Sequence, residues 1–448
     1  MKKLITTLTN IWKIDELRNR ILNTLLFLLI YRIGCHVVLP GVDPDALVQN
    51  REGGNDILNL INMFAGGSFS RAAIFALGVM PYISASIVVQ LLGIAVPAFQ
   101  KMQKEGESGR KKMTQITRYL TVAITLVQAV AYVKTQIGPE AKTIADPMFS
   151  ILSAIVLTAG TLFVMWLGEK ITDKGIGNGI SLIIMAGIIA QLPAGITAEW
   201  ASRMTQGGGG PIPLLIEFVA LFFVVIFTIL IVQGVRKIPV QYAKKIVGNK
   251  QIGGVRQYIP LKVNAAGVMP IIFAQAIMFL PMSLTQFFPN VQSDFLTSLS
   301  NYTSVTYNVV FALLIIAFTF FYTAIMVNPQ QMSEDMKKNG GFIPGVKPGY
   351  ETNLFIDNVI SHITFPGAIF VAIIAILPAI ATLFGVNNQF AHFYGGTSLL
   401  ILVGVVLDTI QQIESHLLMR HYDGLMKTGR VKGRSTASTV EGYDQSAL

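Results

Sequence analysis

The most constraining feature of this chain is a series of apolar runs, each long enough to cross a lipid bilayer as a helix. The hydrocarbon core of a bilayer is about 30 Å thick, so a spanning helix needs about 20 mainly apolar residues. Unbroken apolar runs favour helices over the alternating strands of a membrane barrel. The sequence therefore predicts an all-α polytopic membrane protein with about ten spans. They lie at residues 21–39, 72–96, 116–133, 149–167, 180–196, 213–232, 263–284, 305–327, 359–384 and 398–413.

Composition supports a membrane protein. Hydrophobic residues make up 52% and charged residues 13% of the 448 residues, about half the charged fraction of a soluble domain. The single cysteine, Cys35, excludes an intramolecular disulfide, and with only His36 beside it the ligands are too few for a metal. Residues 1–20 show no cleavable signal and are predicted to form a cytoplasmic amphipathic helix at the membrane interface.

Basic residues are distributed very unevenly between the two sides of the predicted bundle. Of the 34 Lys and Arg, 28 fall in the odd-numbered connecting segments, counted from the N-terminus and including Arg118 at the edge of the third span, and 5 fall in the even-numbered ones. The remaining one, Arg32, lies in the first span. The positive-inside rule then places both termini in the cytoplasm, including the C-terminal tail 414–448.

The ten spans divide into two groups of five, 21–196 and 213–413. An odd number of spans per group gives the two groups opposite orientations, which is an inverted repeat. The string Gly-Val-Met-Pro occurs at 78–81 in the second span and at 267–270 in its counterpart, the seventh. Proline loosens a helix, and paired Gly/Pro-interrupted spans point to a transport site. The alternative is two ordinary kinked helices.

The segment before the second span has an unusual pattern. Residues 57–64 place apolar side chains on one helical face over about two turns, and Gly66 and Gly67 then break the helix. Such a helix is too short to cross the membrane. It either lies on the outer interface or folds inward and closes a pore from outside.

Two predicted cytoplasmic segments are basic. Segment 234–262 carries seven basic residues and no acidic one, and segment 328–357 carries three lysines among Gly and Pro. One interpretation is an orientation signal that also contacts anionic lipid. We favour a docking platform for an acidic partner, such as ribosomal RNA or a motor. The residues assigned to docking are Lys244, Lys245, Lys250, Arg256, Lys337, Lys338 and Lys347.

Enzymatic motifs are missing from the sequence. It has no nucleotide-binding Gly-rich string, no histidine pair at metal-ligand spacing, no serine elbow and no paired catalytic carboxylates. We therefore expect no enzyme, no catalytic residue, no metal and no cofactor. Ionisable residues within or at the edge of spans are few, namely Arg32, Glu217 and Asp408. This scarcity argues against an ion-coupled transporter, which carries such groups deep in its bundle.

Several strings, taken together and in this order, resemble the SecY family, the central subunit of the Sec protein-conducting channel. The similarity runs from about residue 18 to about residue 430. The resemblance implies ten helices in two inverted five-helix halves around a central pore. The strings lie at residues 31–44, 62–71, 80–87, 104–110, 166–169 with 175–181, 261–264 and 395–401.

The resemblance further implies a pore ring and a plug. An aliphatic constriction repels water and ions, and it offers a sliding polypeptide no specific hydrogen bonds. Without the resemblance, these aliphatic residues would simply be core. The ring would consist of Val79, Ile83, Ile180, Ile184, Ile272 and Ile401. The plug would span 57–71 and include Ile61, Phe64, Gly66, Gly67, Ser68 and Arg71.

A lateral gate is implied between the second and seventh spans, the same two that carry Gly-Val-Met-Pro. Three of its residues, Ser84, Gln128 and Asn264, resemble a polar cluster across the gate. Hydrogen bonds between helices in lipid stabilise by about 1 kcal/mol each, although each side chain could instead bond its own helix. The complete gate set is Pro81, Ser84, Ile87, Gln128, Asn264 and Pro270.

The resemblance implies that the chain threads unfolded secretory proteins across a bacterial inner membrane and releases transmembrane helices sideways. The implied partners are SecE-type and SecG-type membrane subunits, a SecA-type ATPase, the ribosome, signal-sequence-bearing preproteins and membrane lipids. The family commonly has arginine where this chain has Lys347, and lysine keeps the charge but loses the bidentate fork. The alternative function is an inverted-repeat secondary transporter or lipid flippase.

Overall fold

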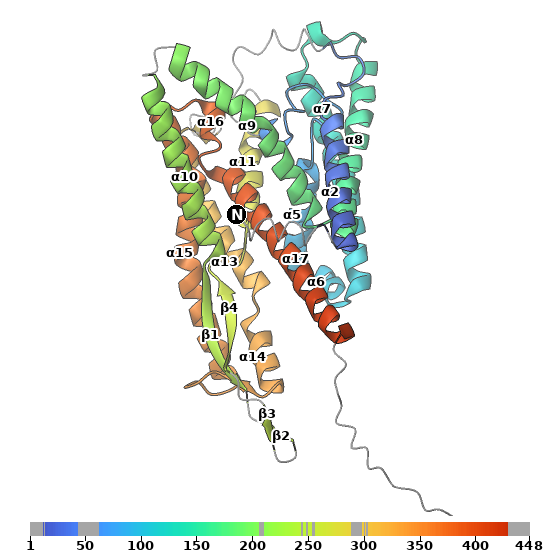
Figure 1. The fold of residues 1–448 in the computed structure, drawn as a ribbon. Coiled ribbons are helices and arrows are strands. Elements are labelled where there is room, and N and C mark those ends of the chain that lie inside the picture. Colours follow the sequence, from blue (N-terminus) through green and yellow to red (C-terminus); the bar gives the residue numbers. More distant parts are fainter. Residues whose placement is uncertain are drawn as a thin grey trace, which may run out of the picture.

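The chain folds into a bundle of long helices with a small antiparallel sheet at one end, as the computed structural model in Figure 1 shows. The structure describes residues 12, 14–43, 62–205, 210–242, 245–247, 250–252, 256–287, 298–299, 301 and 303–428.

The helices fall into two consecutive groups. The first group is α2 (Asp15–Gly34), α5 (Met80–Ala95), α6 (Pro97–Lys104), α7 (Glu107–Gln136), α8 (Met148–Lys174) and α9 (Gly179–Thr205). The second group is α10 (Pro211–Gln233), α11 (Met269–Phe287), α13 (Val305–Met326), α14 (Pro329–Lys338), α15 (Tyr350–Leu383), α16 (Asn388–Ala391) and α17 (Gly396–Thr428).

Each of the ten predicted spans overlaps one helix of the structure. Among the described residues, seven helices are long and apolar enough to cross a membrane, and the bent pair α5 and α6 would make an eighth. The helix α2 falls short because Arg18, Arg20 and Arg32 lie within its 20 residues. The helix α11 has 19 residues, Met269–Phe287, and carries no charged residue.

The two Gly-Val-Met-Pro strings start helices instead of interrupting them. Residues 72–79 and 263–268 form turns, so α5 and α11 begin at Met80 and Met269. Gly78 and Gly267 have φ of 54° and 64°, a left-handed conformation that glycine adopts at little steric cost. A proline in the first helical turn loses no helical hydrogen bond. The predicted starts at 72 and 263 were therefore wrong, and so was the interpretation that Gly-Val-Met-Pro interrupts the two helices.

The two groups touch each other unequally along their two seams. Within the groups, α5 packs on α7 and α11 packs on α13. Between the groups, the extensive contacts among the described residues all involve α9, which packs on α10, α16 and α17. On the other side, α5 and α11 make marginal contact at most. Figure 1 shows α9 and α17 crossing between the groups.

The basic segment after α10 forms strands, which the sequence analysis did not predict. The strands β1 (Val235–Tyr242) and β4 (Arg256–Lys262) pair antiparallel from Val235 opposite Lys262, and β5 (Gly341–Phe342) joins the other edge of β1. The strands β2 (Lys245–Val247) and β3 (Lys250–Ile252) form a separate hairpin. Alternate residues of β1 face a small core. That core consists of Ile238, Val240, Leu261, Met336, Ile343 and Ile356.

Candidate functional site

The centre of the bundle is a hydrophobic cluster to which α2, α5, α8, α9, α11 and α17 all contribute. All six residues predicted for the ring belong to it or pack against it. Val79, Ile184 and Ile401 are buried, and Ile83, Ile180 and Ile272 are partly buried. The structure thus brings together side chains that lie more than 300 positions apart in the sequence. Their role as a pore ring remains a prediction.

The segment predicted to be the plug is seated on this cluster. Met63 and Phe64 are both buried members of it. The chain then turns at Gly66 and Gly67, whose φ values are 64° and 86°, and continues to Ser68, which is fully buried. Arg71 at the end of the segment is exposed. The first part of the predicted plug, residues 57–61 with Ile61, lies outside the described residues.

Side chains from two helices hold this segment by its backbone carbonyls. Arg32 Nη1 in α2 donates to the Gly66 carbonyl at 2.9 Å, and Tyr132 Oη in α7 donates to the Phe69 carbonyl at 2.6 Å. Ser68 Oγ donates to the Ala65 carbonyl at 2.6 Å. Neither Arg32 nor Tyr132 was predicted from the sequence to hold this segment. The available signal was Arg32 itself, since an arginine within an apolar span is costly unless it has a partner.

Backbone packing brings the segment against α9. A Cβ placed on Gly187 would lie 2.8 Å from the Phe64 carbonyl oxygen and 3.1 Å from the Gly66 nitrogen. Real Cβ atoms do not approach backbone atoms this closely. The residue at 187 must therefore be glycine for the segment to sit where it does.

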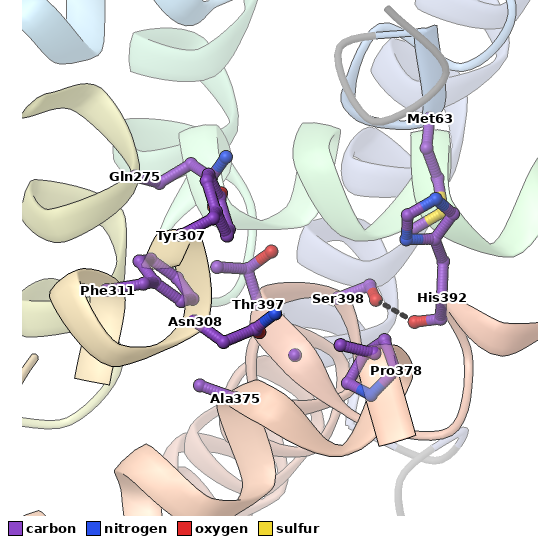
Figure 2. Close-up of a pocket in the computed structure, with 12 residues that line it drawn as sticks. Met63, Gln275, Tyr307, Asn308, Phe311, Ala375, Pro378, His392, Thr397 and Ser398 are labelled. Atoms are coloured by element: carbon purple, nitrogen blue, oxygen red, sulfur yellow. Dashed lines mark hydrogen bonds between the residues drawn. The ribbon is translucent and has the colours of Figure 1, made fainter. Parts of the chain in front are cut away.

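A small pocket with a mixed polar and apolar lining adjoins the segment on the side of the second helix group (Figure 2). Its cavity volume is about 30 Å³, and it lies between α11, α13, α15 and the start of α17. Met63 of the segment borders it, together with Gln275, Tyr307 and Thr397. At its rim, Ser398 Oγ donates to the His392 carbonyl. The segment thus has empty space next to it.

Replacing Arg32 with methionine is expected to loosen the seated segment. The Gly66 carbonyl would lose its charged donor, a loss that costs about 1–3 kcal/mol at a buried site. Labelling of a cysteine at Met63, which is 5% exposed, by a polar maleimide should therefore accelerate. The matched control is Arg20→Met, because Arg20 bonds the Gly175 carbonyl at 3.4 Å. Equal labelling rates in both variants would rule out anchoring by Arg32.

The predicted gate residues lie on α5, on α11 and the turn before it, and, for Gln128, on α7. Their polar members are not joined to one another. Ser84 Oγ donates to the Met80 carbonyl of its own helix at 3.2 Å. Asn264 is buried, and its Oδ1 has no donor among the described residues. No hydrogen bond in the described part of the chain links these side chains to each other or to the half-buried Gln128. The apolar gate residues Pro81, Ile87 and Pro270 are buried.

The basic residues assigned to docking gather at the end of the bundle that carries the strands. Lys245, Lys250 and Arg256 lie on β2, β3 and β4, and Lys244 lies outside the described residues. Three exposed lysines come from the neighbouring elements. Lys337 and Lys338 end α14, and Lys347 lies just before α15.

Comparison with known proteins gives consistent matches over most of the chain. The family model described as SecY matches residues 73–410. A protein translocase subunit SecY of Halalkalibacterium halodurans is 42% identical over 430 residues, covering 94% of this chain and 99% of its own. The SecY of Streptomyces scabiei is 40% identical over 443 residues, covering 95% and 100%.

Solved structures share the fold. One described as a protein conducting channel superposes with a TM-score of 0.64 at 18% identity, covering 92% of this chain and 95% of its own. Sec61 in the canine ribosome-channel complex superposes with a TM-score of 0.60 at 17% identity, over the same shares.

A bundle of membrane-spanning helices with a segment inserted at its hydrophobic centre is the architecture of a polytopic channel subunit. The chain belongs to the SecY family. This membership confirms the predictions of the family, of an all-α polytopic membrane fold, and of a channel subunit that is not an enzyme.

Proposed function

We propose that this chain is the channel through which unfolded secretory proteins cross a bacterial inner membrane. One observation carries the proposal: the described part of the plug segment, residues 62–71, is seated on a hydrophobic cluster to which both helix groups contribute. An aliphatic constriction excludes water and ions, yet it offers a moving polypeptide no hydrogen bonds that would hold it. The relatives are named protein translocase subunits, which agrees with this chemistry.

The inserted segment acts as the plug. It is held by a few hydrogen bonds to backbone carbonyls, such as that from Arg32, and each such bond contributes about 1–3 kcal/mol. A passing chain could therefore move it aside reversibly.

The seam between α5 and α11 is the lateral gate. Because these helices make marginal contact at most, and no hydrogen bond among the described residues joins Ser84, Gln128 and Asn264, little must be broken to part them. An entering signal segment of about 7–15 apolar residues gains about 0.8 kcal/mol for each CH₂ buried in lipid. That gain is sufficient to hold the seam open while the segment leaves sideways.

The chain works with partners on its basic end. In the proposed orientation both termini, the strands and the exposed Lys337, Lys338 and Lys347 face the cytoplasm. These charges suit a SecA-type ATPase or ribosomal RNA. SecE-type and SecG-type subunits would cover lipid-facing surfaces such as α10, where Leu215 and Leu230 are 65% and 64% exposed.

Photocrosslinking to a stalled secretory chain tests the pore assignment. Probes at Ile83, Ile184 and Ile401 are expected to crosslink to the stalled chain, because these side chains surround the proposed path. Probes at the outward-facing Leu215 and Leu230 serve as controls. Crosslinks that arise from the control sites and are missing from the three inner sites would refute the assignment.

A further inference from the structure

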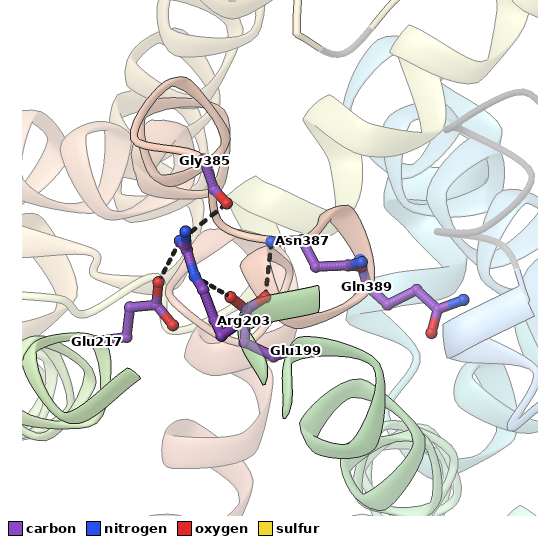
Figure 3. A network of polar contacts seen from close by, with 6 residues as sticks. All are labelled: Glu199, Arg203, Glu217, Gly385, Asn387 and Gln389. Atoms are coloured by element: carbon purple, nitrogen blue, oxygen red, sulfur yellow. Dashed lines mark hydrogen bonds and ion pairs between the residues drawn. The ribbon is translucent and has the colours of Figure 1, made fainter. Parts of the chain in front are cut away.

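A buried ion cluster joins α9 to the second helix group (Figure 3). It lies where α9 ends and α10 begins, at the end of the bundle opposite the strands (Figure 1). Arg203 in α9 donates from Nε to Glu199 Oε1 at 2.9 Å, and from Nη2 to Glu217 Oε1 in α10 at 2.5 Å. The same Nη2 donates to the Gly385 carbonyl at 2.9 Å. The Asn387 backbone N–H donates to Glu199 Oε2 at 2.7 Å.

These charges are largely removed from solvent. The side chains of Glu199, Arg203 and Glu217 are 1%, 12% and 9% exposed. Removing ions from water is expensive, and the expense is offset only where the geometry satisfies the charges. From the sequence, Glu217 was only a residue at the edge of a span, and Arg203 was one of the five basic residues in the even-numbered connecting segments. The structure shows that they form one network.

The network lies between helices that carry the predicted ring. Ile180 and Ile184 are on α9. The turn that holds Gly385 and Asn387 leads through α16 into α17, which carries Ile401. The α9 helix is also the element through which the two helix groups make their extensive contacts. The cluster thus fixes the tight seam, on the opposite side from the loose seam between α5 and α11.

We infer that the cluster of Glu199, Arg203 and Glu217 is a clamp that sets the separation of α9 and α17, and with it the resting width of the constriction. Its three residues are positioning residues, since none of them belongs to the hydrophobic cluster at the centre. The consequence for the constriction rests on the proposed channel function. The clamp itself does not, because it is a statement about the distance between two helices.

The two carboxylates have different tasks, and this difference makes the clamp testable. Glu199 accepts a different donor on each oxygen, Arg203 Nε–H on one and the Asn387 N–H on the other. A glutamine there must turn its NH₂ group toward a donor. Glu217 accepts on Oε1, and its Oε2 has no donor among the described residues. A glutamine at 217 can place its NH₂ group at the Oε2 position, where it does not face another hydrogen-bond donor.

Distance measurements between spin labels test the clamp without any client or motor. Labels replace Ile189 on α9 and Val406 on α17, which are 45% and 37% exposed, in the full chain reconstituted with its companion subunits. Glu199→Gln is expected to raise the population of longer distances by about tenfold, because it leaves a buried donor unpaired. Glu217→Gln is the matched control and is expected to change that population less than about twofold.

A second variant keeps the inference falsifiable if Glu199→Gln does not fold. Arg203→Lys retains the charge but loses the planar fork that reaches both carboxylates and the Gly385 carbonyl, so it should lengthen the distances as well. Unchanged distances in a folded Glu199→Gln or Arg203→Lys variant would overturn the clamp. So would equal lengthening in Glu217→Gln.

Ion conductance of the same variants separates the clamp from the channel function. Longer distances with raised conductance support both. Longer distances with unchanged conductance support the clamp and contradict its control of the constriction. A purely stabilising role would lower the melting temperature of Glu199→Gln while the label distances in the folded fraction stayed the same, and that result would reject the clamp.

Discussion

Replacing Gly187 with valine is expected to unseat the plug and make the resting channel leak ions. A Cβ at this position lies 2.8 Å from the Phe64 carbonyl oxygen, and valine adds two further methyl groups, so the segment must move. Overpacking of this kind costs about 1–3 kcal/mol, which corresponds to roughly 5- to 150-fold in the ratio of unseated to seated plug. Conductance of planar bilayers containing the variant, without client or motor, measures the effect.

Two variants of α9 control this experiment. Gly187→Ala places only the Cβ against the segment and should give a smaller leak of the same kind. Ile189→Val puts a β-branched valine into the same helix at a side chain that is 45% exposed, and it should leave conductance unchanged. If Gly187→Val conducts no more than Ile189→Val, then α9 does not hold the plug in place.

The sequence was informative wherever the bilayer constrains it. Apolar runs of about 20 residues have few alternatives in lipid, since every backbone polar group must be satisfied within the segment. Each predicted span therefore overlaps a helix of the structure. The break at Gly66 and Gly67 was also foreseeable, because consecutive glycines permit the left-handed conformation that both adopt.

Polar contacts between distant segments could not be predicted. The partner of Arg32 is the backbone carbonyl of Gly66. Every residue has a backbone carbonyl, so the sequence does not indicate which one accepts the hydrogen bond. The donors that satisfy Glu199 come from Arg203 and from the Asn387 backbone, 188 positions away. Hydropathy reports how deep a residue lies but not which neighbour it meets. Ser84 is a further example, because hydropathy does not show that its hydroxyl bonds a carbonyl of its own helix.

Starts of helices were misplaced for a local reason. In an apolar stretch, a turn and a helix have the same hydropathy, so residues 72–79 and 263–268 read as parts of spans. The deciding feature was the left-handed glycine two residues before the first helical methionine, at Gly78 and Gly267. The strands β1 and β4 were missed because the density of basic residues drew attention to charge, while the alternation of Ile238 and Val240 was the structural signal.

The two seams together explain how such a bundle can open without falling apart. The groups are joined by extensive packing and buried ions at α9, and by marginal contact between α5 and α11. Strain imposed at the centre by a passing chain will therefore part the loose seam first, because fewer contacts must be lost there. The same asymmetry predicts that changes at the centre alter the seal more readily than they alter the fold.

Replacing Ile401 with asparagine is expected to wet the constriction, raise ion conductance and admit clients with defective signals. Exposing an amide there lowers the barrier to water by about 1–3 kcal/mol, or roughly 5- to 150-fold in conductance. Leu400→Asn is the matched control, since both residues are 2% exposed but Leu400 packs in a different cluster. The control should lose stability and stay ion-tight. Equal conductance in the two variants would mean that Ile401 is ordinary core and that the constriction lies elsewhere.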